Sequence, residues 1–152
     1  MEVVLTMTTD QEEQKLIDRL RAEKCSCIIR KGNEVRVFRG RGVMDLYRLL
    51  KEEPEFLNGA FAADKVVGKA AAALMILGGV KKTFAGVISR PARTLFDENR
   101  IEVDFTTEVP LIINRTQTDW CPLEKRCMNA ISAEECLPII ENFMVESVRC
   151  GQ

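Results

Sequence analysis

The spacing of apolar residues changes several times along the chain, and these changes predict alternating helices and strands. Apolar residues three and four positions apart line one face of a helix, as Leu16 and Leu20 do. Apolar residues two apart line one face of a strand, as Val35 and Val37 do. Helices are expected at 10–23, 43–53, 64–77, 91–99, 122–128 and from 132 onward, strands at 25–30, 35–39, 81–89, 101–105 and 109–113, and a loop or short strand at 56–63.

This order of elements predicts an α/β fold with a mixed sheet sandwiched by helices. The turn sequence Lys31-Gly32-Asn33-Glu34 joins the first two strands into an antiparallel hairpin. The later strands are separated by helices, and such crossovers make neighbouring strands parallel. A length of 152 residues without a repeat or a linker favours one domain, 1–152.

The longest apolar run, Gly59 to Gly79, consists largely of alanine and glycine. Small side chains allow close helix packing, so we expect a central buried helix from about Asp64 to Leu77. Lys65 and Lys69 would then share one helix face and receive an anion at the helix start. Two simpler interpretations remain open: Asp64 caps the helix, and the lysines extend into solvent.

The composition excludes several classes of chemistry. The chain has no histidine, which removes Ser-His-Asp triads, Cys-His pairs and histidine-bound metals. The net charge of −1 gives no global argument for nucleic-acid binding, although a local basic patch is not excluded. No apolar run approaches the ~18–20 residues that span a bilayer, and no secretory signal is visible. We therefore expect a cytoplasmic protein whose six cysteines are reduced thiols.

Two further segments carry candidate chemistry. Cys121 precedes Pro122 at the start of a short expected helix, where a thiol becomes more nucleophilic; a buried structural thiol is the alternative. The polar loop before it, with Asn114 and Arg115, is expected to form a binding edge. Arg93 lies at another expected helix start and either adds positive charge for a phosphate or carboxylate or faces solvent.

Two segments, AADKVVGKAAAALMILGGVKKTFAGVIS and VPLIINRTQTDWCPLE, resemble a bacterial family called domain of unknown function 1893. The resemblance covers roughly residues 27–128. It implies a cytidine-deaminase-like fold with three α/β/α layers. It also strengthens the functional interpretation of Cys121, which lies in a loop of that family's W/M-C-P-x-E type.

The zinc ligands of the deaminases are absent from this sequence. Zinc deaminases carry H-x-E at the start of one helix and P-C-x-x-C at the start of the next. Asp64 falls near the first ligand position, and Val66 replaces the catalytic glutamate. Ala92 and Leu95 replace the two cysteines. We expect neither a metal site nor another cofactor, and the fold would have lost or replaced its zinc chemistry.

Two functional hypotheses follow. In the first, the protein binds a nucleotide or another small anion between the central helix and the Cys121 loop, with cysteine- or lysine-dependent chemistry there. In the second, it is a non-catalytic module that binds RNA or a protein; a homodimer fits either. The first hypothesis assigns catalysis to Asp64, Lys65 and Cys121 and ligand binding to Lys69, Asn114, Arg115 and Arg93.

Overall fold

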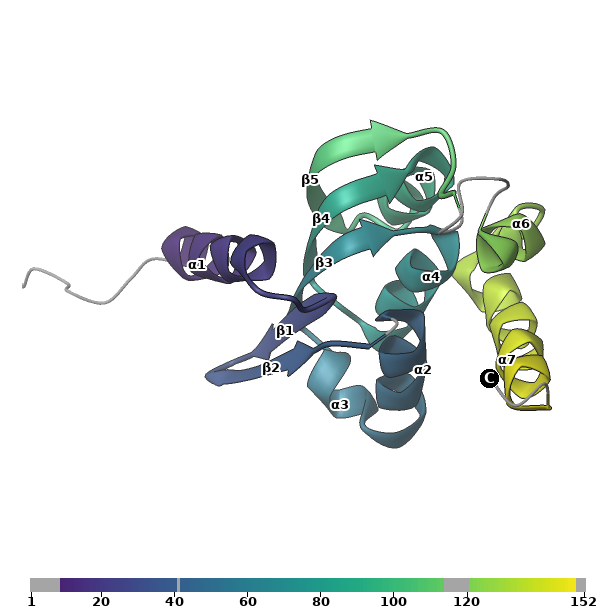
Figure 1. Ribbon diagram of the computed structural model, residues 1–152, viewed down its shortest axis with the longest axis horizontal. Coiled ribbons are helices and arrows are strands. Elements are labelled where there is room, and N and C mark those ends of the chain that lie inside the picture. Colours follow the sequence, from purple (N-terminus) through teal and green to yellow (C-terminus); the bar gives the residue numbers. More distant parts are fainter. Residues whose placement is uncertain (1–8, 41, 114–120, 150–152) are drawn as a thin grey trace, which may run out of the picture.

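The computed structural model describes residues 9–40, 42–113 and 121–149 and contains a five-stranded sheet in the order β2-β1-β3-β4-β5 (Figure 1). Strand β1 is antiparallel to both β2 and β3, whereas β3, β4 and β5 run parallel. The predicted α/β class with a mixed sheet is therefore confirmed. The strands are β1 (Cys27–Lys31), β2 (Glu34–Phe38), β3 (Phe61–Val67), β4 (Lys82–Ser89) and β5 (Glu102–Val109).

Helices cover both faces of this sheet (Figure 1). They are α1 (Thr9–Ala22), α2 (Gly42–Glu52), α3 (Pro54–Leu57), α4 (Lys69–Gly78), α5 (Arg90–Glu98), α6 (Pro122–Cys127) and α7 (Ala133–Arg149). Helix α1 packs on one face through a small apolar cluster that includes Leu20, Ile28 and Phe84. The larger core lies on the opposite face and includes side chains of α2, α4, α5 and α7. None of the described helices is long and apolar enough to cross a membrane.

The small residues of α4 place it at the centre of the larger core, as predicted. The alanines from Ala70 to Ala73 are each at most 3% exposed, and α4 contacts α2, α5 and α7. Gly78 is needed for this packing, because a Cβ atom there would lie 2.6 Å from Leu57 Cδ1. The helix ends at Gly79, whose φ of +84° favours glycine.

The start of this helix was predicted wrongly. Residues 61–67 form strand β3, and α4 begins only at Lys69. Strand β3 pairs with β1 on one side and β4 on the other, so its backbone groups find partners in the sheet. The run from Ala60 to Ala63 contains only small and apolar residues, which gives no period to separate a buried strand from a buried helix.

Where strands were predicted at 101–105 and 109–113, one strand, β5, runs from Glu102 to Val109; residues 110–112 belong to no strand, and Ile113 makes an isolated bridge. Thr106 and Thr107 are β-branched and continue the strand through the expected break. The last helix, predicted from 132 onward, begins with a capping box. The backbone N–H of Glu135 donates to Ser132 Oγ at 3.1 Å, and the Glu135 carboxylate accepts the N–H of Ile131 at 3.1 Å.

Candidate functional site

The candidate site lies where the parallel strands β3 and β4 end and the helices α4 and α5 begin. Gly68 precedes α4 and provides no side-chain cap. Ser89 precedes α5, and its hydroxyl accepts the backbone N–H of Ala92 at 3.2 Å. Because both strands are parallel, the two helix N-termini face the same edge of the sheet. Such an edge is the usual ligand position in open α/β sheets.

The carboxylate of Glu124 occupies this meeting point. Glu124 belongs to α6, is 3% exposed, and accepts the backbone N–H of Lys69 at 2.7 Å. The same oxygen accepts the Ser89 hydroxyl at 3.3 Å, and the second oxygen accepts the N–H of Ile112 at 2.9 Å. A Cβ atom on Gly68 would lie 3.3 Å from both carboxylate oxygens. The protein therefore supplies its own anion to the start of α4.

The side chain of Lys69 turns away from Glu124 and is 8% exposed. Its ammonium group donates to the carbonyl oxygen of Met128 at 3.2 Å and to that of Ala130. Within the described ranges, Lys69 forms no ion pair with a carboxylate. The ammonium is thus a buried charge held by neutral carbonyl groups.

Two buried thiols also lie close to Lys69. A hydrogen bond with Cys127 lowers the pKa of Cys136; burial opposes this shift, and the nearby Lys69 charge adds to it. The same hydrogen bond, together with burial, raises the pKa of Cys127. Both thiols are free, and both residues are fully buried in the larger core. Lys69 is therefore surrounded by carbonyl and thiol groups.

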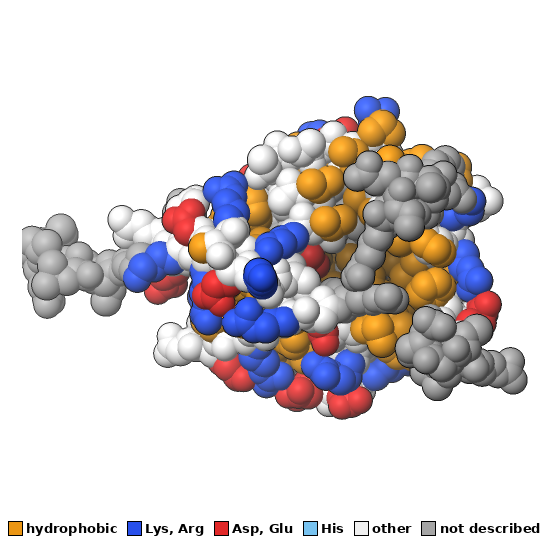
Figure 2. Space-filling view, viewed as in Figure 1, with side chains coloured by type: hydrophobic (Ala, Val, Ile, Leu, Met, Phe, Trp, Pro, Cys, Tyr) orange, Lys and Arg blue, Asp and Glu red, His pale blue; other side chains and the backbone are white. Residues whose placement is uncertain are grey.

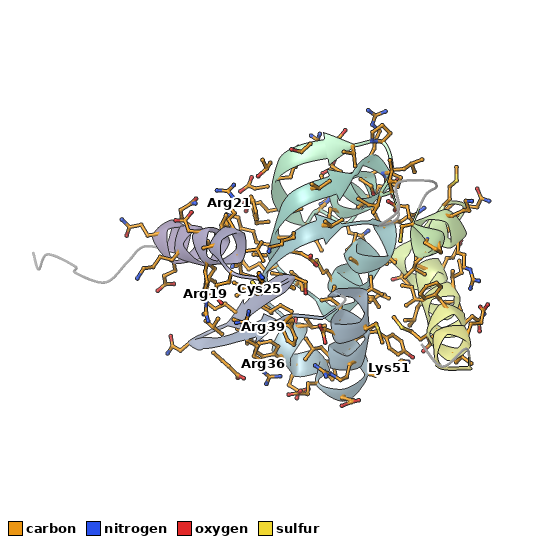
Figure 3. The ribbon with its side chains drawn as sticks, in the orientation of Figure 1. Arg19, Arg21, Cys25, Arg36, Arg39 and Lys51 are labelled. Atoms are coloured by element: carbon orange, nitrogen blue, oxygen red, sulfur yellow. The ribbon has the colours of Figure 1, made fainter. Side chains whose placement is uncertain are left out.

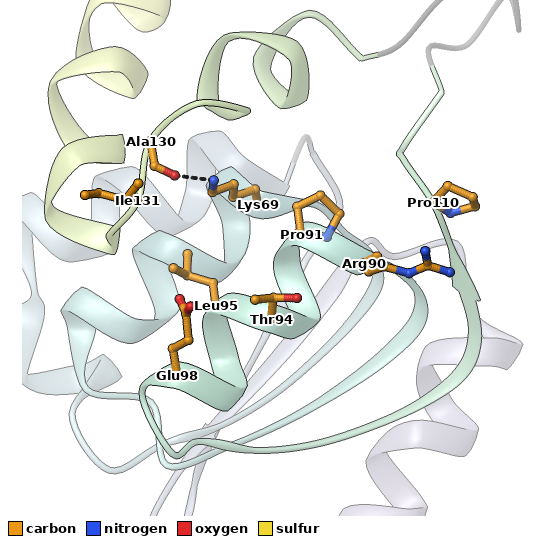
Figure 4. A pocket seen from close by; sticks show the side chains of 9 residues that line it. All are labelled: Lys69, Arg90, Pro91, Thr94, Leu95, Glu98, Pro110, Ala130 and Ile131. Carbon is orange, nitrogen blue, oxygen red and sulfur yellow. Dashed lines mark hydrogen bonds between the residues drawn. The ribbon is translucent and has the colours of Figure 1, made fainter.

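A cavity of 420 Å³ opens beside Lys69, between α4, α5, the segment after β5 and the turn between α6 and α7 (Figure 4). The ammonium of Lys69 points toward Ala130 at one side of the cavity, whereas the guanidinium of Arg90 points away toward Pro110 (Figure 4). Arg90 pairs with Glu108 on β5 at 3.4 Å. The lining residues are Lys69, Arg90, Pro91, Thr94, Leu95, Glu98, Pro110, Ala130 and Ile131.

Asp64 and Lys65 belong to β3, and neither is among the described residues that line this cavity. The Lys65 ammonium donates to the carbonyl oxygen of Glu23 at the end of α1, at 2.9 Å. Asp64 is 3% exposed and accepts the N–H of Val66 at 3.2 Å. The shared helix face predicted for Lys65 and Lys69 is therefore wrong.

The environment of Asp64 is unusual for a carboxyl group. Its Oδ2 atom has no hydrogen-bond partner among the described residues. Burial raises the pKa of Asp64 to about 7, although hydrogen bonds from the N–H groups of Val66 and Lys65 partly oppose this shift. Asp64 is therefore a buried carboxyl group that titrates near neutral pH.

The remaining predicted residues do not line the cavity in the described part of the chain. Cys121 is half-buried at the start of α6, where its N–H donates to the carbonyl oxygen of Ile112 at 2.8 Å. Arg93 pairs with Glu108 at 2.7 Å, and its guanidinium lies 5.0 Å from the ring centre of Phe105. Asn114 and Arg115, predicted to bind the ligand, lie outside the described residues.

Glu124 is the site residue that the sequence interpretation missed. Its signal was present, because Glu124 is the last residue of the W-C-P-x-E segment that begins at Trp120. The chemistry predicted for this segment was assigned to Cys121 instead. Only the fold shows that a glutamate 55 residues beyond Lys69 reaches the N-terminus of the central helix.

The basic side chains near the β1–β2 hairpin do not form a separate positive patch in the view of Figures 2 and 3, where they alternate with acidic side chains. Arg19 and Arg39 both pair with Glu23, at 2.7 Å and 3.1 Å. Arg36 pairs with Glu53 at 3.0 Å. Arg19 and Arg39 thus share the single negative charge of Glu23.

Comparisons with known proteins place the chain in one family and one fold. A family model described as TM1506, domain of unknown function (DUF1893), matches residues 15–144. A crystal structure of a DUF1893 family protein (TM1506) from Thermotoga maritima is similar, with a TM-score of 0.80 and 22% sequence identity. The alignment covers 93% of this chain and 96% of that one, and at this identity it shows a shared fold. No curated protein matches the chain.

Proposed function

The chain belongs to the DUF1893 family, and we propose that it binds a small anionic ligand, a phosphate or a carboxylate, in the cavity beside Lys69. The observation that carries this proposal is the buried Lys69 ammonium, whose described hydrogen-bond partners are only the carbonyl oxygens of Met128 and Ala130. Burying a charge without an opposite charge is costly. An anion in the adjacent cavity supplies that opposite charge.

The ligand contact in this proposal is the lysine side chain and not the free N-terminus of α4. An ammonium group has three N–H donors, and carbonyl groups accept two of those of Lys69. The third donor remains for the ligand. The N–H of Lys69 itself is already bound to Glu124, so an external anion cannot use it while that hydrogen bond holds.

We also infer that the sheet and its helices adopt the cytidine-deaminase-like fold that the resemblance implies. The inference is supported by the order β2-β1-β3-β4-β5 and by α4 and α5, which follow the adjacent parallel strands β3 and β4. Zinc deaminases place their two motifs at such helix starts. The positions predicted for the first motif, Asp64 and Val66, lie in β3, so Gly68 and Ala70 stand at the start of α4 instead, and Ala92 and Leu95 stand in α5. None of the last four residues can bind zinc through a side chain.

The ligand proposal is tested by calorimetric titration of the protein with inorganic phosphate, cytidine monophosphate and acetate. We expect Lys69→Met, which keeps the length of the side chain and removes its charge, to weaken binding at least tenfold. Lys81→Met is the matched control, because Lys81 is exposed and lies outside the cavity. Equal losses in both variants, or binding of none of the three anions by the unchanged protein, would contradict the proposal.

The alternative function, a protein-binding module, is supported by a different observation at the same place. Met128 and Ile131 are 46% and 78% exposed in the turn between α6 and α7, and Ile131 also lines the cavity. Exposed apolar side chains grouped at one site are typical of protein interfaces. If the partner is a second copy of the chain, Ile131→Asp converts the dimer to a monomer in sedimentation velocity experiments.

A further inference from the structure

We infer that the ligand is bipolar, with an anionic group at Lys69 and an amino group at Glu98; this inference rests on the anion site proposed above. The described lining of the cavity has one carboxylate, Glu98, and its cations are Lys69 and Arg90. In Figure 4, Lys69 lies toward the α6–α7 turn, and Glu98 lies at the other end of α5 from Arg90. The lining is therefore positive at one end and negative at the other.

One face of α5 carries this polarity. Pro91, Thr94, Leu95 and Glu98 follow the spacing i, i+3, i+4 and i+7, which places their side chains on the same side of a helix. Each residue advances a helix by about 1.5 Å, so the Cα atoms of Pro91 and Glu98 lie about 10 Å apart along the axis. A ligand that reaches from Lys69 to Glu98 follows this helix face.

The carboxylate of Glu98 is available to a ligand. It forms no ion pair or hydrogen bond within the part of the chain that the structure describes. Its neighbours differ in this respect: Asp97 pairs with Arg93 at 4.0 Å, and Glu102 pairs with Lys82 at 3.2 Å. Glu98 is thus an unpaired acid that faces the cavity.

The middle of the cavity sets the remaining features of the ligand. Leu95 and Ile131 provide apolar walls, and the hydroxyl of Thr94 is the one uncharged polar side chain of the lining. The volume of 420 Å³ lies in the lower part of the range of about 300–1,000 Å³ for small-molecule sites. The ligand class is a small phosphate or carboxylate with an apolar or aromatic middle and a terminal amino group. A ligand with anions at both ends would place one of them against Glu98.

The test compares two phosphate monoesters with the same six-carbon chain, hexyl phosphate and 6-aminohexyl phosphate, by titration calorimetry and by chemical-shift titration of the amides. The unchanged protein is expected to bind the amino compound roughly threefold more tightly, as an exposed ion pair of moderate strength would give. Glu98→Gln should abolish this preference and leave hexyl phosphate binding unchanged. Asp97→Asn, a neighbouring substitution outside the cavity lining, should preserve the preference.

The outcomes separate the two proposals. One outcome is that hexyl phosphate binds, that its binding requires Lys69, and that 6-aminohexyl phosphate binds no more tightly. The proposal of a bipolar ligand is then wrong, whereas the proposed anion site is supported. If the preference survives Glu98→Gln, the role of Glu98 is likewise wrong. If neither compound binds, the proposed anion site is wrong, and the proposal of a bipolar ligand, which rests on that site, is wrong as well.

Discussion

Glu124 and Lys69 connect α4 and α6 in both directions. The Glu124 carboxylate accepts the backbone N–H of Lys69 at 2.7 Å, while the Lys69 ammonium reaches the carbonyl oxygens of Met128 and Ala130 just beyond α6. The two contacts fix the α6–α7 turn on the start of the central helix. That turn forms one wall of the cavity, so the shape of the cavity depends on this pair.

Replacing Glu124 by glutamine should destabilise the protein. The carboxylate accepts N–H groups on both oxygens, from Lys69 at 2.7 Å and from Ile112 at 2.9 Å. A glutamine amide has one acceptor atom, so its NH₂ group must face one of these donors. We expect a loss of about 2–3 kcal/mol in the free energy of unfolding, measured by urea denaturation. Glu134→Gln, on the exposed first turn of α7, is the control and should leave the urea midpoint unchanged.

The buried Asp64 should make stability fall as the pH rises through neutrality. Its pKa is about 7 in the folded protein against an ordinary value of 3.8. Between these values the folded state holds a proton that the unfolded state has released, so the free energy of unfolding decreases with increasing pH. Ion-paired acids such as Glu53 and Glu108 have lowered pKa values, and their stabilisation is lost only in more acidic solution. Burial also raises the pKa of Asp45, and the pKa of Cys136 is lowered, so Asp64 is isolated by the difference between the unchanged protein and a variant without this carboxyl group from pH 5 to pH 8.

The substitution Asp64→Asn tests this dependence. Asparagine keeps the acceptor for the N–H of Val66 and cannot ionise. The NH₂ group of asparagine replaces the unpartnered Oδ2 and lowers the free energy of unfolding by a similar amount at every pH. The measurement to compare is therefore the slope of the free energy of unfolding against pH. We expect the wild-type protein to lose about 1–3 kcal/mol relative to the variant between pH 5 and pH 8. Parallel curves for the two proteins would contradict a raised pKa; Asp97→Asn, at an exposed position, should show the wild-type slope.

Much of the fold could be predicted from local patterns in the sequence, and the site could not. The predicted start of the last helix near 132 and the predicted end of the central helix near 77 are confirmed, and both depend on residues a few positions apart: the capping box of Ser132 and Glu135, and Gly79. The boundary between β3 and α4 was misplaced because an all-apolar run has no period. That error put Asp64 and Lys65 on a helix, when strand pairing places them in the sheet.

The cavity could not be predicted from the sequence, for a related reason. Its lining combines residues of α4, α5, the segment after β5 and the α6–α7 turn, which are up to about 60 positions apart. No local pattern marks Glu98 or Ile131 as neighbours of Lys69. The sequence shows Lys69 as a charge within an apolar run, but the hydrogen-bond partners of its ammonium group depend on tertiary packing.

Thiol labelling should distinguish Cys121 from the other described cysteines. Cys121 is half-buried at the start of α6, whereas Cys25, Cys27, Cys127 and Cys136 are buried. In a Cys150→Ser background, iodoacetamide followed by peptide mass spectrometry is expected to modify Cys121 first, because exposure controls access. The hypothesis of an activated nucleophile requires more: Cys121 must react faster than the same thiol in an unfolded peptide of residues 115–128. A slower reaction would leave Cys121 as a structural residue.

The contact between Gly78 and Leu57 should show strong energetic coupling. A Cβ atom at Gly78 would lie 2.6 Å from Leu57 Cδ1 and 2.9 Å from Leu57 Cβ, too close for two carbon atoms. Leu57 is fully buried beneath α4, so its side chain has little room to move. We expect Gly78→Ala to cost about 1–3 kcal/mol by overpacking, despite the better helix propensity of alanine.

A double-mutant cycle separates this overpacking from other effects of the substitution. Leu57→Ala alone should cost about 2–5 kcal/mol, because it leaves a cavity in the core. In that background the obstructing Cδ1 atom is absent but the Cβ atom at 2.9 Å remains, so Gly78→Ala should still be destabilising, by about 1 kcal/mol less than in the unchanged protein. Urea denaturation of the four proteins gives the coupling energy. If Gly78→Ala costs the same in both backgrounds, the glycine is required by the backbone of α4 and not by close approach to Leu57.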